Sequence, residues 1–375
     1  APVLRKGDAA PAYYHLFPES DLRKLIEKAT TSGIITDLYN SSRLYQLIWK
    51  PLEKAIERTR RLYIAPDGLL HLVSFTAVKT ENGTFLPDRH ELRMVTSSRN
   101  ILKENESEIP ANDSLSIVLF GGINYDADSL SLVKANKELY SVRSFSPELS
   151  ASTTSGSPEW QYMPGTKSET DSIANLFETG KKELIQGDRA TEESFKNLSG
   201  HSPSVIHIAT HGFSFHDMKK MNWSLGNETL KEQHTLQVKP LLQSGLVMAG
   251  ANRLPQGKKR IEGTDDGFLT AYEISLLDLS RSRLAVLSAC KTGLGLVSGN
   301  EGVFGLQRAF KMAGIKSLII SLWEVPDQQT SELMYLFYLF WRNGNDQYKA
   351  LEAAQKKMRE KYDNPYYWAG FVLIE

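Results

Sequence analysis

The sequence of 375 residues is 41% hydrophobic, which is enough apolar material for one large or two ordinary domains with a sizeable core. Its 44 Lys and Arg residues balance 44 Asp and Glu residues, which argues against nucleic acid and against a membrane surface as partners. A single cysteine excludes an intrachain disulfide and a multi-cysteine metal site. We therefore expect a protein of the reducing cytoplasm, with no cofactor and no metal.

The N-terminal region predicts a small mixed module. It has no signal-peptide core and no initiator Met, so we expect the sequence to be the C-terminal part of a longer chain. Residues 19–31 predict a helix, and apolar side chains at three- and four-residue spacing predict a second helix that kinks or restarts at Pro51. We predict strands at 61–65, 69–78 and 92–95 and interpret residues 1–112 as an α/β module without a catalytic group.

Residues 113–375 predict the main domain. Buried-strand patterns alternate there with helical patterns, which favours a mostly parallel sheet covered by helices on both faces. Residues 216–262 interrupt this alternation and are interpreted as an insertion loop that contains one strand at 245–250. The other predicted strands are 115–122, 184–185, 204–212, 284–290, 315–323 and 368–374, and the predicted helices are 166–177, 191–198, 269–277, 302–314, 328–342 and 346–361.

Two of these strands end in residues that could perform chemistry together. One ends at Cys290 and another at His211, and glycines follow both. Chemistry in open α/β sheets gathers beyond the carboxyl ends of the strands. If the two strands are parallel neighbours, the imidazole can take the proton of the thiol or stabilise the thiolate. Taken singly, a cysteine is more commonly a buried apolar residue and a histidine merely hydrogen-bonded, but the matching placement of both favours a reactive pair.

A metal hydrolase is a weaker interpretation of the same histidines. His207 lies four residues before His211, so the two share a face of the strand but are about 13 Å apart. This separation is too large for joint ligation of one metal ion. We therefore expect His207 to have a structural role.

Several motifs together resemble the CHAT family of caspase-like cysteine peptidases, which is related to separases. The resemblance covers most of the chain and implies a caspase-like α/β fold. CHAT domains often follow helical repeats of the tetratricopeptide type, so the resemblance also implies an upstream repeat region or regulatory partner. The motifs that carry it are Pro66–Gly68, Pro164–Thr166, Ala209–Gly212, Gly267–Ile274, Leu287–Gly293, Asn300–Phe310, Ser321–Asp327 and Tyr366–Phe371.

The resemblance implies roles for particular residues. Cys290 would be the nucleophile that attacks a peptide carbonyl, and His211 its acid–base partner. The backbone N–H groups of Gly212 and Cys290 would bind the oxyanion. The caspase pattern Gln-Ala-Cys-Arg-Gly is replaced here by residues 288–293, Ser-Ala-Cys-Lys-Thr-Gly, which argues against cleavage after aspartate.

An acidic residue in the S1 pocket would select a basic substrate side chain, as in relatives that cut after Arg or Lys. Asp327 matches the corresponding aspartate of the separase-like motif, and Glu324 and Asp266 are further candidates. Asp327 could instead be the N-cap of the helix that starts at residue 328. Both interpretations of Asp327 stay open on the sequence alone.

The sequence therefore predicts a cysteine endopeptidase that cleaves a specific protein substrate after a basic residue, under control of an upstream sensor or partner. The family resemblance also suggests a role in bacterial defence. The first alternative is a catalytically silent CHAT-fold binding or scaffold module. A second alternative is another cysteine hydrolase, such as an amidase.

Overall fold

The computed structural model describes residues 1–31, 35–99, 101, 115–137, 149–151, 159–214, 223–225, 241–242, 244–258, 261–290 and 301–375. Most of the predicted insertion loop, 216–262, lies outside these ranges. None of the helices within them combines the length and the apolar character that crossing a bilayer requires.

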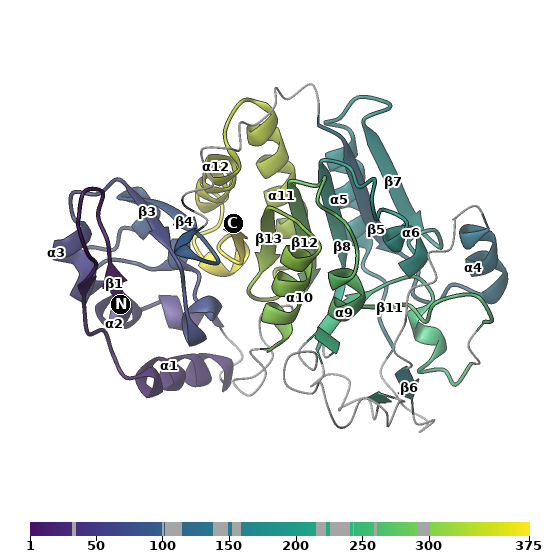
Figure 1. Ribbon diagram of the computed structural model, residues 1–375, viewed down its shortest axis with the longest axis horizontal. Helices are drawn as coiled ribbons and strands as arrows, with labels where there is room; N and C mark the ends of the chain where they lie inside the picture. The colour runs from purple at the N-terminus through teal and green to yellow at the C-terminus, as the bar shows by residue number, and fades with distance from the viewer. Residues whose placement is uncertain are drawn as a thin grey trace.

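One large sheet forms the centre of the molecule, and its strand order is β11-β10-β8-β12-β13-β14-β4-β3, with β5 pairing to β8 and β7 (Figure 1). Six of its pairings are parallel and three are antiparallel, namely β13 with β14, β8 with β10 and β10 with β11. The prediction of a mostly parallel sheet is therefore confirmed. The strands are β3 (Arg61–Ile64), β4 (Glu91–Met94), β5 (Ile117–Ile123), β7 (Lys182–Gly187), β8 (Val205–Ser214), β10 (Ser244–Val247), β11 (Phe268–Thr270), β12 (Leu284–Cys290), β13 (Ser317–Ser321) and β14 (Phe371–Ile374), with the small pairs β1 (Pro2–Val3) with β2 (Ala12–Tyr13) and β6 (Leu149–Ala151) with β9 (Trp223–Leu225).

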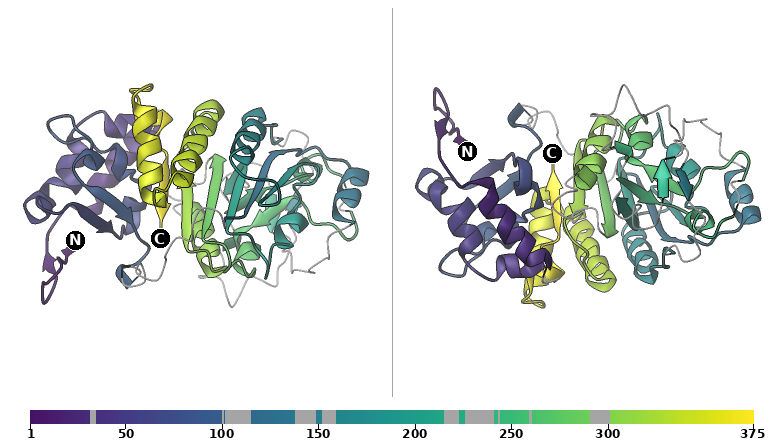
Figure 2. Two further views of the ribbon diagram at one scale, coloured as in Figure 1. Left: turned by 90° about the horizontal axis from the view of Figure 1, so that it is seen from above. Right: turned by 90° about the horizontal axis from the view of Figure 1, so that it is seen from below.

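Helices cover both faces of this sheet, as predicted (Figure 2). α5, α11 and α12 lie side by side on one face, and α9 and α10 pack together on the other. The central strands are mostly apolar, as expected for strands covered on both faces, and every residue of β5 and β13 is buried. The helices are α1 (Glu19–Thr31), α2 (Arg43–Ile48), α3 (Glu53–Ile56), α4 (Ser129–Asn136), α5 (Pro164–Ala174), α6 (Glu192–Lys196), α9 (Ala271–Ser275), α10 (Glu301–Met312), α11 (Asp327–Arg342) and α12 (Gln347–Arg359).

The N-terminal region departs from the prediction at one element. Residues 69–78 were expected to form a strand, but they form two 3₁₀ helices, η3 and η4. The Asp67 carboxylate accepts a hydrogen bond from the Gly68 N–H and starts the first of them. Leu69, Leu72 and Phe75 are buried by packing in these short helices, so their apolar character did not require a strand. The 3₁₀ helices are η1 (Ile35–Tyr39), η2 (Lys50–Leu52), η3 (Gly68–Leu72), η4 (Phe75–Ala77), η5 (Leu86–Asp88), η9 (Ala251–Arg253) and η10 (Pro365–Tyr367).

The other differences are elements that were not predicted, namely α4 and the two small strand pairs, and shifts at element ends. Leu269 was assigned to a helix but lies in β11, and Trp368 precedes β14 rather than opening it. The predicted restart at Pro51 is confirmed, because α2 ends before it and α3 follows η2. Gly314 ends the α10 segment with φ +97°, a conformation that favours glycine.

Candidate active site

β8 and β12 are parallel neighbours, and their ladder ends where the predicted catalytic pair lies. The register runs from Leu284 opposite Val205 to Cys290 opposite His211. Neighbouring strands lie about 4.8 Å apart, so the two backbones meet at the carboxyl edge of the sheet. The side chain of Cys290 lies outside the described part of the structure, and the distance from its sulfur to the imidazole stays a prediction.

Gln161, Tyr125 and Trp160 contact the imidazole of His211. Its Nε2 lies 2.8 Å from the backbone carbonyl oxygen of Gln161. The rings of Tyr125 and Trp160 each lie 5.2 Å from the imidazole, centroid to centroid. A carbonyl oxygen can only accept a hydrogen bond, so Nε2 carries the hydrogen and Nδ1 is the basic nitrogen of the neutral ring.

Gly212 follows the histidine in β8. It pairs in register with Leu246 of β10, so β8 changes partner from β5 to β10 at its carboxyl end. The N–H groups of Gly212 and Cys290 remain the predicted oxyanion donors.

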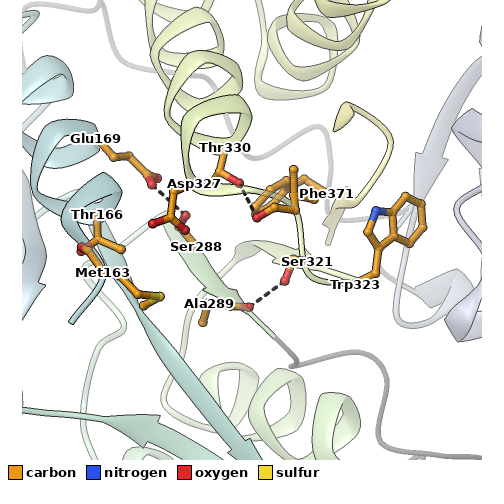
Figure 3. A pocket seen from close by; sticks show the side chains of 11 residues that line it. Met163, Thr166, Glu169, Ser288, Ala289, Ser321, Trp323, Asp327, Thr330 and Phe371 are labelled. Atoms are coloured by element: carbon orange, nitrogen blue, oxygen red, sulfur yellow. Dashed lines mark hydrogen bonds between the residues drawn. The ribbon is translucent and has the colours of Figure 1, made fainter. Parts of the chain in front are cut away.

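A narrow pocket opens beside the end of β12, between α5, β13, α11 and the start of β14. Figure 3 shows the carboxylates of Asp327 and Glu169 pointing toward the same space in it. Its free volume is about 10 Å³. A volume of that size holds about one water molecule. A lysine or arginine side chain can enter only if the walls move apart.

Asp327 lines this pocket and has no hydrogen-bond or ion-pair partner among the residues that the structure describes. This residue is half-buried. It is the first residue of α11, Pro326 is the N-cap, and no side chain caps the helix. The alternative that Asp327 is an N-cap is therefore wrong. A Cβ atom on Gly165 would lie 2.3 Å from the Cβ of Asp327, so only glycine allows this approach to α5.

The two other acidic candidates lie elsewhere. Glu324 is exposed and is not part of the pocket lining. Asp266 lies in the turn before β11, where its Oδ1 accepts a hydrogen bond from the Phe268 N–H at 3.1 Å. Of the three candidates, the structure places only Asp327 in the wall of the pocket.

Glu169 of α5 forms the back of the pocket and was not found from the sequence. It is 2% exposed; Oε1 lies 3.0 Å from His207 Nε2, and Oε2 accepts a hydrogen bond from the Ser288 hydroxyl at 3.1 Å. His207 and Ser288 belong to β8 and β12, so this carboxylate links the strands that carry the predicted pair. A charged residue among the inward-facing positions of α5 is the signal that could have revealed it.

The buried end of this network explains the position of His207. Its Nδ1 lies 3.2 Å from the hydroxyl of Tyr338 in α11. Burial, and then the negative charge of Glu169, raise the pKa of Tyr338 well above its usual range. The hydroxyl therefore stays protonated and can donate to Nδ1, which leaves Nε2–H to donate to Glu169. His207 thus has the structural contacts that we expected.

Comparison with known proteins identifies two relatives. The proteins named Tetratricopeptide repeat protein 28 of Homo sapiens and Mus musculus are each 24% identical to this chain, over 359 and 365 residues. Each match covers 88% of this chain and 13% of the relative. The chain therefore spans a small part of the length of these relatives.

Solved structures of proteases are also similar. The Saccharomyces cerevisiae separase–securin complex matches with a TM-score of 0.42 and 12% identity, over 83% of this chain and 15% of that chain. The Arg-specific cysteine proteinase gingipain R (RgpB) matches with a TM-score of 0.40 and 12% identity, over 95% of this chain and 74% of that one. The complex of Porphyromonas gingivalis RgpB pro- and mature domains matches with a TM-score of 0.43 and 9% identity, over 95% and 75%.

The sequence profile of the CHAT domain matches residues 40–375, which is most of the chain and includes both strands of the candidate site. This chain belongs to the CHAT domain family.

Proposed function

We propose that this chain is a cysteine endopeptidase in which Cys290 is the nucleophile and His211 is its acid–base partner. The observation that carries the proposal is the pairing of these two residues at the last rung of the β8–β12 ladder. The hydrogen bond from Nε2 of His211 to Gln161 supports it, because it leaves Nδ1 as the base. Membership of the CHAT family supports the same reaction class.

The reaction runs in two balanced steps. The Cys290 thiol gives its proton to His211, and the thiolate sulfur bonds to the peptide carbonyl carbon. The carbonyl oxygen becomes an oxyanion, for which the N–H groups of Gly212 and Cys290 are the proposed donors. The C–N bond then breaks and the leaving amine takes the proton from His211. In the second step His211 takes a proton from water, the hydroxide displaces sulfur, and the thiol and a carboxylic acid are released.

We propose that the pocket beside the ladder is the S1 subsite and that Asp327 selects a basic side chain there. Its carboxylate has no ion-pair partner among the described residues, while both oxygens of Glu169 are already engaged. An arginine or lysine side chain would supply the missing charge.

Control by another region follows from the size of the same pocket. Its free volume of about 10 Å³ is smaller than a basic side chain, so such a side chain enters only a wider conformation, and an activator would raise the population of that conformation. Two relatives are named for tetratricopeptide repeats and are far longer than this chain. We propose that a repeat region or a partner is this activator in the reducing cytoplasm. The proposed role in bacterial defence rests on the family resemblance alone.

The closed pocket also favours the alternative, a CHAT-fold module that binds a partner without catalysis. The two differ in one property. A peptidase must have an activated thiol at Cys290, whereas a scaffold needs none.

Covalent labelling tests the proposal. Peptide acyloxymethyl ketones with Arg, Lys, norleucine or Gln at P1 would be incubated with the chain, and adducts would be counted by intact mass. We expect one adduct with Arg or Lys, none in Cys290→Ala, and much slower labelling in His211→Ala. Adducts in Cys290→Ala, or equal rates for wild type and His211→Ala, would reject the proposed chemistry.

The pocket assignment is tested by Asp327→Asn in the same assay. Loss of one partner of a buried charge pair costs about 2–5 kcal/mol, so labelling by the Arg probe should slow roughly 30-fold or more. Labelling by the norleucine probe is the matched control and should be unchanged. An unchanged preference for Arg over norleucine in this variant would reject the role of Asp327.

A further inference from the structure

We infer that Asn252 is a positioning residue for His211: its side-chain amide holds the segment whose carbonyl accepts the imidazole N–H. The inference rests on the proposed peptidase function. Asn252 belongs to η9, inside the region predicted as an insertion loop, and no sequence motif pointed to it.

The amide of Asn252 clamps both backbone groups of one residue. Its Oδ1 accepts a hydrogen bond from the Trp160 N–H at 2.7 Å, and its Nδ2 donates to the Trp160 carbonyl at 3.0 Å. Nδ2 also donates to Oδ1 of Asp126 at 3.0 Å. The side chain is 1% exposed, so water does not compete for these bonds.

The clamped residue lies directly against the catalytic imidazole. The ring of Trp160 contacts His211, and the next carbonyl along the chain, that of Gln161, is the acceptor of the His211 Nε2 hydrogen. A shift of the Trp160 peptide therefore moves both a wall of the imidazole site and its hydrogen-bond acceptor.

Asn252 also contacts the second aromatic neighbour of the imidazole. Its backbone N–H donates to the carbonyl of Tyr125 at 3.0 Å, and the Tyr125 ring lies 5.2 Å from the His211 ring, centroid to centroid. One residue thus ties together the two aromatic neighbours of the imidazole. Gly250, with φ +81°, sets the turn that brings Asn252 here, and a Cβ on it would lie 2.6 Å from Leu132 Cδ1.

Only an amide of this length fits the contacts. Aspartate would lose both Nδ2 donors and place a carboxylate beside the Trp160 carbonyl and the Asp126 carboxylate. Alanine would release the Trp160 peptide. With the acceptor displaced, Nε2–H would no longer be fixed, and Nδ1 would no longer be held as the basic nitrogen of the proposed acid–base partner.

The neighbouring Gln256 is the matched control. Its Nε2 donates to Asp126 Oδ1 and to Glu159 Oε1, each at 3.1 Å, but it has no hydrogen bond to Trp160. Gln256 is exposed, so Gln256→Ala removes a nearby amide without releasing the Trp160 peptide.

The test uses alkylation of Cys290, the only cysteine in the chain, so that no substrate is needed. The rate of iodoacetamide labelling of the 375-residue chain would be followed by intact mass from pH 4 to 10. A thiolate stabilised by His211 reacts well below the usual thiol pKa of about 8.5. We expect Asn252→Ala to move the midpoint of the labelling rate against pH toward the usual thiol pKa and to slow labelling at pH 6 by about tenfold. The labelling rate of Gln256→Ala should stay within about twofold of the wild-type rate.

Each outcome decides a stated point. An unchanged profile in folded Asn252→Ala overturns the positioning role while leaving the peptidase proposal intact. A wild-type midpoint near that of a free thiol, unaffected by His211→Ala, rejects the proposed function and the positioning role with it. If Asn252→Ala does not fold, Asp126→Ala removes an exposed anchor of the amide and should give a smaller shift in the same direction; no shift in that variant also overturns the role.

Discussion

Lys311 of α10 illustrates how a single partly buried cation affects stability. Its ammonium donates hydrogen bonds to the carbonyl oxygens of Lys316 and Ile374. Burial lowers the pKa of Lys311 from 10.5 to about 8, and the nearby charge of Glu375 opposes this only partly. The charged form is therefore less favourable in the folded chain than in the unfolded one.

This pKa predicts a stability difference that depends on pH. Between about pH 8 and 10.5 the unfolded chain binds the proton more tightly, so the free energy of unfolding should rise with pH in that window. Relative to Lys311→Met, the rise should approach about 3 kcal/mol, since one pKa unit corresponds to about 1.4 kcal/mol. Urea unfolding at several pH values would measure it. Lys311→Arg stays charged and should lack the rise; a flat difference between wild type and Lys311→Met would contradict the prediction.

At the residue scale, the proposed catalytic residues were easier to predict from the sequence than the residues that hold them in place. Cys290 ends β12 and lies opposite His211 at the last pair of the β8–β12 ladder, although β8 itself continues to Ser214. The sequence predicts both strands, so the place of this pair at one edge followed from topology. Gln161, Trp160 and Asn252 support the imidazole through backbone contacts or from a segment without a motif. Such contacts depend on which loops meet in space, and the sequence contains no periodic signal for that.

At the scale of elements, Lys196 joins α6, α9 and the turn before β11. Its Nζ lies 3.1 Å from Glu192, 2.7 Å from Asp265 and 2.8 Å from Glu273, and Lys196 is 2% exposed. Burial by itself lowers the pKa of Lys196, but the carboxylates outweigh it and raise the pKa above its usual range. Burial also raises the pKa of Glu192 well above its usual value, and the neighbouring acids, Asp266 among them, add to this.

Removal of this buried cation should be costly. Lys196→Met would leave three carboxylates together without their counter-charge, and breaking a buried ion pair typically costs about 3–5 kcal/mol. Lys361→Met is the control, because its ion pair with Glu332 at 2.8 Å has a lysine side chain 56% exposed. That pair should contribute about 0–1 kcal/mol. Chemical denaturation at neutral pH measures both, and equal losses would contradict the prediction.

The type of an element was predictable where its apolar pattern fits either a strand or a helix but not both. The buried strands β5, β8, β12 and β13 were all predicted from apolar runs of strand length, and α1 from residue 19 to residue 31. The strand prediction for residues 69–78 was wrong because their apolar side chains are buried by short 3₁₀ helices, and that packing leaves no periodic pattern in the sequence.

At the scale of the whole molecule, the N-terminal region continues the central sheet. Met94 of β4 is paired with Ile374 of β14, and the Glu375 N–H donates to the Met94 carbonyl at 3.0 Å. The Tyr348 hydroxyl donates to the same carbonyl at 2.7 Å, and the Ser74 hydroxyl donates to the carbonyl of Ala369 at 2.7 Å. One connected hydrophobic core includes residues from both regions.

The division into residues 1–112 and 113–375 stays a prediction, and unfolding tests it. Because hydrogen bonds and core packing cross that boundary, we expect a single cooperative transition for the whole chain, with coincident fluorescence and circular dichroism curves. A fragment of residues 113–375 should fail to fold, since β14 and α12 would lose their packing partners. Two separate transitions, or a stable fragment, would instead support independent domains.

The sequence by itself determined the α/β class, the order of most strands and helices, and the two strands that carry Cys290 and His211. Local apolar patterns decide these features, because a strand or helix must bury one or both of its faces wherever it lies. Only the tertiary structure decided that Asp327 rather than Glu324 or Asp266 lines the pocket. It also decided that Glu169 bonds to His207 and that Asn252 bonds to Trp160. Those positions depend on how distant elements pack and on which buried polar groups find partners, and no short stretch of sequence specifies that.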